Sequence, residues 1–233
     1  MIDDSDAFVL PKPYNGNCTP YNICNFTKQK VKEYVEWNTN MVFKVVVIGD
    51  VSVGKTCIIN RFCHHLFETH YKATIGVDFE VETFTVFGLS VSLQILYSIS
   101  LNILAIIVTF DLSNLITLSH CELWLKDALE ANLTRKPLIF LVGNKMDLLS
   151  SAAYISMEEI SIKVAENLLA EYWPVSAKNG TNVDSLFLRV AALLLDVHFL
   201  NKSEANDELC IGINLAVREK ITKKKKPNCA CNH

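Results

Sequence analysis

The sequence predicts an α/β domain built on a doubly wound, mostly parallel sheet of six strands. Short apolar runs rich in β-branched residues alternate along the chain with segments of helical periodicity, which is the pattern of strands buried on both faces and joined by helices. Polar motifs follow directly after several of these strands, where doubly wound sheets bind their ligands. The chain has 233 residues, half of them hydrophobic, and this suits one such domain with tails.

The composition excludes several classes of protein. The formal net charge is −3, so the chain as a whole has no nucleic-acid footprint. The acidic start, Met-Ile-Asp-Asp-Ser-Asp, is unlike a secretory signal, and the longest apolar run, Leu101 to Phe110, is too short to span a membrane. The eight cysteines are scattered without metal-ligand spacing, so we expect reduced cytosolic thiols. Because there is no secretory signal, we expect glycosylation sequons such as Asn132-Leu133-Thr134 to be unmodified.

Three regions are expected along the chain. Residues 1–40 form an N-terminal extension, in which Thr27 to Trp37 predict a short helix. That helix could bind a partner, but packing on the domain's own surface is the favoured interpretation. Residues 41–200 form the domain, and residues 201–233, polar and then basic, form a flexible tail.

The first predicted element is a strand, a glycine-rich loop and a helix in direct succession. Phe43 to Ile48 is almost wholly apolar and predicts a buried strand, and Thr56 to Phe62 predict the first turns of a helix. Between them, Gly49 to Thr56 spell G-x-x-x-x-G-K-[ST], the phosphate-binding loop, in the structural context that the motif requires.

Each type of residue in this motif has a chemical task. Gly49 and Gly54 let the backbone turn so that several N–H groups face a phosphate, and the helix N-terminus adds its dipole. Lys55 supplies a positive charge to the β and γ oxygens, and the Thr56 hydroxyl can ligate Mg²⁺. A chance glycine turn before a helix is the alternative, which the strand and helix context disfavours.

The middle of the chain predicts a hairpin, a strand and a helix. Val77 to Phe87 and the alternating apolar residues from Val91 to Ile95 form two strands joined by a turn at Gly88. Leu104 to Phe110 is a buried strand, and Leu115 to Leu129 carry apolar residues at helical spacing.

The last third of the chain continues the alternation. Leu138 to Val142 predict a strand, and Ser156 to Glu159 form a capping box that opens a helix ending near Ala170. Tyr172 to Val175 predict a short strand, and Asn182 is expected to cap a helix that ends near Phe199.

Two further polar motifs predict specificity for a purine base. Asn144-Lys145-Met146-Asp147 follows a buried strand, and the Asp147 carboxylate can accept hydrogen bonds from N1 and N2 of guanine. Adenine lacks this pair of donors, so it would leave groups unpaired. Ser176-Ala177-Lys178 follows the last strand and could supply a backbone N–H to guanine O6. Each motif alone could be a charged loop, but together and in this order they predict a guanine site.

These motifs together resemble the Rab family of the Ras superfamily, with its P-loop NTPase fold. Tyr71 to Phe79 resembles the first switch of Rab proteins, and Gly49 to Cys57 resembles their phosphate loop. The resemblance covers about Phe43 to Leu200. Three features are similar to those of a Golgi- and lysosome-associated branch of the family: the sequence of the phosphate loop, the run Ala170 to Trp173 and the N-terminal extension.

The resemblance implies GTP or GDP with Mg²⁺ as ligands. It implies that Thr74 completes the Mg²⁺ shell and senses the γ-phosphate, and that Phe67 stacks edge-on against guanine unless it is a core residue. A branched side chain at Val51 could hinder an incoming arginine finger. The implied metal ligands are Thr56 and Thr74, and the implied nucleotide contacts are Ser52, Val53, Gly54, Lys55, Thr56, Cys57, Phe67, Thr74, Asn144, Lys145, Asp147, Ser176, Ala177 and Lys178.

The tail resembles a lipid-modified Rab terminus. Cys229 and Cys231 lie close to the end, and the family carries two geranylgeranyl groups on such cysteines, which gives stable anchoring. The lysines from Lys223 to Lys226 would favour an anionic leaflet. The resemblance implies the cytosolic face of Golgi, vesicles or lysosomes, with an exchange factor, a GTPase-activating protein, effectors and a GDP-dissociation inhibitor as partners. An unmodified tail is the alternative.

One family motif is missing from the sequence. After Gln94-Ile95 the family continues Trp-Asp-Thr-Ala-Gly-Gln and a helix, whereas this chain reads Leu96 to Leu104 and then rejoins the pattern. The Gln that orients the attacking water is absent, so no catalytic residue is identified. We expect a taut link without the second-switch helix and a large apolar area left bare on one face of the sheet.

The resulting prediction is a membrane-trafficking switch that binds GTP and GDP and in which hydrolysis is impaired. A non-cycling pseudo-GTPase that acts through interactions, or an unstable isoform, is the alternative. An adenine-specific phosphate-loop enzyme is a third possibility, against which Asp147 and the Ser176 to Lys178 motif argue.

Overall fold

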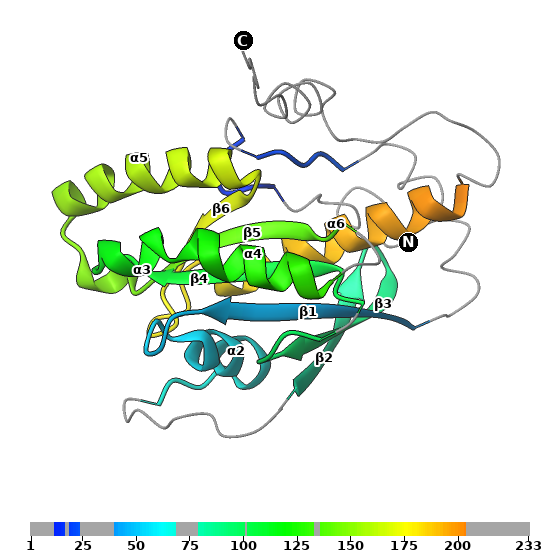
Figure 1. Cartoon of the computed structure of the whole chain (residues 1–233). Coiled ribbons are helices and arrows are strands. Elements are labelled where there is room, and N and C mark those ends of the chain that lie inside the picture. Colours follow the sequence, from blue (N-terminus) through cyan, green and yellow to red (C-terminus); the bar gives the residue numbers. More distant parts are fainter. Residues whose placement is uncertain are drawn as a thin grey trace, which may run out of the picture.

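The computed structural model describes residues 12–16, 19–23, 40–68, 79–100, 102–132 and 136–203. It contains one six-stranded sheet with helices on both faces (Figure 1). The strands are β1 (Met41–Gly49), β2 (Phe79–Val86), β3 (Leu89–Leu96), β4 (Ala105–Asp111), β5 (Leu138–Asn144) and β6 (Glu171–Pro174). The helices are α2 (Lys55–His64), α3 (Leu115–Ser119), α4 (Cys121–Ala131), α5 (Ser151–Leu168) and α6 (Val183–Ser203), with a 3₁₀ turn, η1, at Met146–Leu148.

The strand order, β2-β3-β1-β4-β5-β6, confirms the predicted fold class. β2 and β3 form the expected antiparallel hairpin, while β3, β1, β4, β5 and β6 run parallel. Because the chain passes from β1 to β3 on one side and then to β4 on the other, the order reverses at β1. Ligands of doubly wound sheets bind at such a switch point, beyond the carboxyl ends of the strands.

The helices form two layers, and each covers an apolar cluster. α2 and α6 pack on one face of the sheet, where Ile58 and Phe187 are fully buried. α3, α4 and α5 pack on the opposite face (Figure 1). β1 serves both layers, because Val45 and Val47 belong to the first cluster and Val46 and Ile48 to the second. This alternation explains why the strand reads as a continuous apolar run.

The link from β3 to β4 spans residues 97–104, and its described part contains no helix. Ile103 is fully buried, and Asn132 at the end of α4 clamps it from both sides. The Ile103 N–H donates to Asn132 Oδ1 at 3.2 Å, and Asn132 Nδ2 donates to the Ile103 carbonyl at 2.9 Å. The Leu104 N–H then donates to the Lys44 carbonyl at 2.9 Å. Hydrogen bonds therefore fix the end of the link to α4 and to β1.

The face of β1, β2 and β3 next to this link is exposed in part. Val42, Phe79 and Val81 are 59%, 53% and 50% exposed. Polar residues share their face: Thr83 and Ser92 are cross-strand neighbours with hydroxyl oxygens 2.7 Å apart. The bare surface is therefore less apolar than the sequence predicts, because polar side chains on β2 and β3 divide the exposed hydrophobic ones.

Described residues of the segments 12–16 and 19–23 pack along the β5–β6 edge of the sheet. The Ile139 N–H donates to the Tyr21 hydroxyl at 2.7 Å, and Arg189 Nη2 donates to the Tyr21 carbonyl at 3.0 Å. Arg189 also forms a buried ion pair with Glu171 at 3.1 Å. These contacts tie part of the extension to the domain. The helix predicted over Thr27 to Trp37 lies outside the described residues.

The predicted start of the fifth helix is wrong. α5 begins at Ser151, not near Ser156, and the Ser150 side chain caps it by accepting from the Ala153 N–H at 3.4 Å. Ser150 is itself a good capping residue, and the alanines that follow it favour helix, so the helix begins at Ser151 instead of near Ser156. The Ser156 capping box consequently lies inside the helix.

Two other boundaries differ from the sequence interpretation. The single helix predicted over Leu115 to Leu129 is divided into α3 and α4. The Ser119 hydroxyl donates to the Ile116 carbonyl at 2.7 Å, and such back-bonding disturbs a helix. Asn182 precedes α6 as predicted, with φ near 60°. Its side-chain amide donates to the Pro174 carbonyl at 2.8 Å and so joins the start of α6 to β6.

Replacing the clamp residue, Asn132→Ala, should lower the free energy of unfolding by about 2–4 kcal/mol, because two buried backbone groups of Ile103 lose their partners. Urea denaturation followed by tryptophan fluorescence measures this. Asn201→Ala, at an exposed position near the end of α6, is the matched control and should change stability by less than about 0.5 kcal/mol. A similar small effect for both variants would contradict the role of the clamp.

Candidate functional site

The loop after β1 adopts a conformation that its two glycines make possible. Gly49 has φ near 137°, and a Cβ there would lie 2.1 Å from the Thr109 carbonyl oxygen. Gly54 has φ near 95°, and a Cβ there would lie 2.3 Å from Asn144 Nδ2. Any other residue would therefore both strain the backbone and clash with a neighbouring strand end. The loop then leads into α2, whose N-terminal N–H groups suit an anion.

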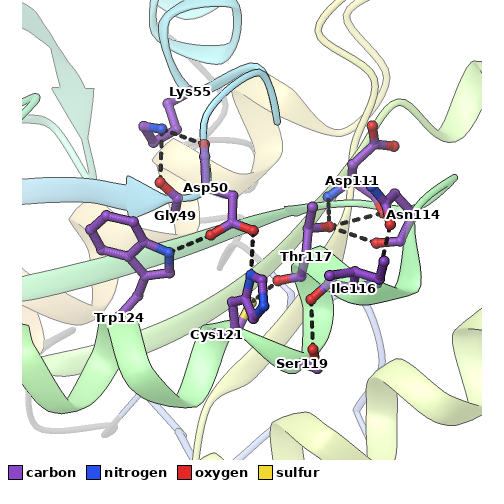
Figure 2. A network of polar contacts seen from close by, with 11 residues as sticks. Gly49, Asp50, Lys55, Asp111, Asn114, Ile116, Thr117, Ser119, Cys121 and Trp124 are labelled. Atoms are coloured by element: carbon purple, nitrogen blue, oxygen red, sulfur yellow. Dashed lines mark hydrogen bonds and ion pairs between the residues drawn. The ribbon is translucent and has the colours of Figure 1, made fainter.

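Lys55 places its ammonium group over this loop. Its Nζ donates to the Gly49 carbonyl at 2.9 Å and to the Asp50 carbonyl at 2.6 Å, as Figure 2 shows. Burial lowers the pKa of Lys55, and the nearby Asp50 carboxylate opposes this shift. A cation held by two carbonyls of the loop is well placed to receive phosphate oxygens.

The side chain of Asp50 anchors the loop to the helices behind it. Trp124 Nε1 donates to Asp50 Oδ1 at 2.7 Å (Figure 2), and His120 Nδ1 lies 2.7 Å from Asp50 Oδ2. Burial raises the pKa of Asp50, but the hydrogen bonds from Trp124 and His120 outweigh it and hold the pKa below its usual range. Sequence reasoning missed this anchor, because the helix contributes its partners from 70 and more residues away.

Asn144, at the end of β5, connects the loop to the last motif of the site. Its Nδ2 donates to the Val53 carbonyl at 2.9 Å, and its Oδ1 accepts from the Ala177 N–H at 3.1 Å. The residue is 2% exposed, so these bonds form away from water. A purine O6 that approached the Ala177 N–H would share this donor with Asn144.

The Asp147 carboxylate is held in place from two directions. The Ser176 hydroxyl donates to its Oδ1 at 2.6 Å, and Lys178 Nζ lies 3.8 Å from its Oδ2. The Asp147 side chain keeps 14% of its surface exposed. A fixed carboxylate with a partly open edge is suited to accept two N–H bonds from a base.

Lys145 makes an ion pair that the sequence did not predict. Its Nζ lies 2.6 Å from Asp111 Oδ2, at the end of β4. Burial raises the pKa of Asp111, but the bonds from Lys145 and Ser113 outweigh it and hold the pKa below its usual range. The signal was available, because Asp111 is a carboxylate at the carboxyl end of a buried strand, where the other polar motifs also lie.

Comparison with known proteins identifies the family to which this arrangement belongs. The family model described as Ras family matches residues 44–196. The chain belongs to the Ras family. It is 42% identical over 206 residues to the human Ras-related protein Rab-34, covering 81% of this chain and 80% of that protein. It is 46% identical over 173 residues to the human Ras-related protein Rab-36, covering 69% of this chain and 65% of that protein.

These identities confirm the resemblance to Rab proteins, and we refer to the chain as a Rab from here on. Members of the Ras family are GTPases, which hydrolyse GTP to GDP, and Rab-like GTPases act in membrane trafficking. The six-stranded, mostly parallel sheet agrees with this family's fold. The fold and the family were therefore both predicted correctly from the sequence.

The structure of this Rab brings most of the predicted site residues to one edge of the sheet. The phosphate loop follows β1, the Asn144 to Asp147 motif follows β5, and the Ser176 to Lys178 motif follows β6. Phe67 lies three residues beyond the end of α2 and is half-buried against the first apolar cluster. Thr74, Cys229 and Cys231 lie outside the described residues.

Two further observations concern metal ligands and membrane spans in the described part of the chain. Among the described residues, no three His, Cys, Asp or Glu side chains gather as a metal site. Of the helices that the structure describes, none is long and apolar enough to cross a membrane.

The variant Asp147→Asn should weaken GTP binding at least about a hundredfold, because the amide leaves one guanine donor without an acceptor. The same variant should gain affinity for xanthosine triphosphate, whose C2 carbonyl needs a donor. Displacement of a fluorescent guanine nucleotide measures both. Asp184→Asn, an exposed position in the first turn of α6, is the matched control. Equal GTP affinity in Asp147→Asn and the parent would refute the assignment of the base site.

Proposed function

We propose that this Rab binds GTP and GDP together with Mg²⁺ at the carboxyl edge of β1, β5 and β6. The observation that supports this most strongly is the position of Asn144, which joins the phosphate loop to the Ala177 N–H beside a fixed Asp147 carboxylate. Phosphate-binding and base-binding groups thus form one continuous site. An adenine-specific enzyme would have no use for the carboxylate in this place.

Each part of the ligand has proposed partners in the chain. The N–H groups from Ser52 to Cys57 and the Lys55 ammonium would hold the phosphates. Asp147 would accept from the guanine edge, the Ala177 amide would donate to O6, and Phe67 would stack beside the ring. Lys145, Ser176 and Lys178 keep this base pocket in shape.

The donors for Mg²⁺ fit the ion only in part within the described residues. The Thr56 hydroxyl lies in the first turn of α2, next to Lys55, and an oxygen ligand is what Mg²⁺ prefers. Thr74 is proposed as the second protein ligand. When bound, Mg²⁺ supplies neutralisation of charge on the phosphate oxygens.

We further propose that GTP hydrolysis is impaired. The link between β3 and β4 carries no Gln to orient water, and Ile103 in it is buried under the Asn132 clamp. A switch with this defect would remain GTP-bound unless nucleotide exchange resets it. A non-cycling pseudo-GTPase is the alternative, and absence of guanine-nucleotide binding would support it.

The tail and its partners complete the proposal. Geranylgeranyl groups on Cys229 and Cys231, with the lysines from Lys223 to Lys226, would anchor the protein to the cytosolic face of Golgi, vesicle or lysosome membranes. The proposed partners are an exchange factor, a GTPase-activating protein, effectors and a GDP-dissociation inhibitor.

Binding of fluorescent GDP and GTP, in Mg²⁺ and in EDTA, tests nucleotide binding, and single-turnover hydrolysis tests the defect. The comparison is with a variant in which the family's Asp-x-x-Gly-Gln segment and helix are restored after Ile95. We expect guanine-specific, Mg²⁺-dependent binding by both proteins and hydrolysis at least about tenfold faster in the restored one. Absence of guanine binding would refute the proposed function, and equal hydrolysis rates would refute the defect alone.

Replacement of both cysteines, Cys229→Ser with Cys231→Ser, should move the protein from membranes to cytosol, whereas either single replacement should leave partial, reversible association. Fractionation of cells measures this. Cys210→Ser, elsewhere in the tail, is the matched control and should remain on membranes. Unchanged fractionation of the double variant would contradict the lipid anchor.

A further inference from the structure

Arg61 connects two parts of the base site, and no motif in the sequence marks it. It lies in the last turn of α2, and each of its three guanidinium nitrogens donates to a different backbone carbonyl. Nε donates to Ala177 at 2.8 Å, Nη2 donates to Lys178 at 2.7 Å, and Nη1 donates to His65 at 2.7 Å. One planar group therefore reaches the Ser176 to Lys178 loop and the end of α2 together.

The first two bonds determine the direction of peptide N–H groups in the loop. A trans peptide is planar, so its N–H points away from its own carbonyl. By holding the Ala177 carbonyl, Arg61 fixes the plane that carries the Lys178 N–H. The Ala177 N–H is fixed separately by Asn144 Oδ1 at 3.1 Å. The two consecutive amides that could face a purine O6 are thus held by Arg61 on one side and by Asn144 on the other.

The third bond holds the turn that leads to Phe67. His65 ends α2 in the left-handed conformation with φ near 56°, and its N–H donates to the Arg61 carbonyl at 3.1 Å. Because Arg61 Nη1 also donates to the His65 carbonyl, both the N–H and the carbonyl of His65 are hydrogen-bonded to Arg61. Phe67 follows two residues later, and it is the proposed stacking residue. Arg61 therefore joins both walls of the proposed base pocket.

We propose that Arg61 is a positioning residue for purine recognition, which aims the Lys178 amide at O6 beside the Ala177 amide that Asn144 holds, and so contributes to selection at position 6 of the base. This inference rests on the proposed guanine site and deepens it. The fork of the guanidinium is essential, since one lysine ammonium cannot hold three carbonyls in fixed planes.

The test compares three nucleotides that differ at single positions of the base. GDP carries O6 and the N2 amino group, inosine diphosphate lacks the amino group, and 6-thioguanosine diphosphate replaces O6 with sulfur, a weak acceptor. Affinities are measured by displacement of fluorescent GDP from the parent, Arg61→Gln and Arg61→Lys. Lys126→Gln, which removes one exposed positive charge on α4, is the control.

Both Arg61 variants should bind GDP and inosine diphosphate about tenfold more weakly than the parent does, but should lose less than about threefold for 6-thioguanosine diphosphate. The control should match the parent. Equal losses for all three nucleotides would show a merely structural role and would overturn the inference, as would full affinity in Arg61→Lys. If the parent itself has no guanine preference, the proposed function fails first. If the parent prefers guanine but the losses are equal, only the role of Arg61 fails.

Discussion

The parallel pairing of β1 with both β3 and β4 is the constraint on which the rest of this structure depends. It sets the carboxyl end of β1 at the centre of the sheet, so that the glycine loop after Gly49 meets the ends of β4 and β5. The close approach is visible in the distance of 2.1 Å that a Cβ at Gly49 would have from the Thr109 carbonyl oxygen. A doubly wound sheet thus supplies both the position of the phosphate loop and the reason why its first residue is glycine.

The same pairing makes the link between β3 and β4 demanding. Two strands that are both parallel to β1 and lie on opposite sides of it must be joined by a chain that returns past the whole of β1. Residues 97–104 make this return, and the cost is a face of β1, β2 and β3 that keeps Val42, Phe79 and Val81 exposed. Asn132 compensates at one point by satisfying both backbone groups of Ile103, which would otherwise be buried without partners.

The site itself is held together by hydrogen bonds of side chains, not by contacts between catalytic groups. Asn144 ties the phosphate loop to the Ala177 amide, Asp50 ties the same loop to α4 through Trp124, and Arg61 ties the Ala177 carbonyl to α2. All three hold segments that carry N–H groups for an anion or a base. Such a site can retain nucleotide binding even where the groups for hydrolysis are missing, because binding and turnover depend on different segments.

Much of this protein is determined by its sequence alone. The pattern of apolar residues identified all six strands, the hairpin and the helices that join them. Burial on one or both faces of an element imposes this pattern on its sequence, whichever neighbour it packs against. The glycine loop, Asp147 and Ala177 could be proposed as site residues because each follows a strand, and parallel strands bring their carboxyl ends to one edge. The family followed from the same residues.

Other features could not be read from the periodicity of the sequence, and the longest-range ones were decided only by the tertiary structure. The start of α5 at Ser151 and the break between α3 and α4 depend on local competition among capping and hydroxyl groups, which periodicity does not resolve. Asp50, Asp111 and Arg61 each have a partner that lies between 34 and 117 residues away in the chain. Charged side chains are long, and their contacts follow no periodic pattern along the chain. The sequence therefore shows that they are present, but only the folded sheet determines which backbone group or opposite charge each one contacts.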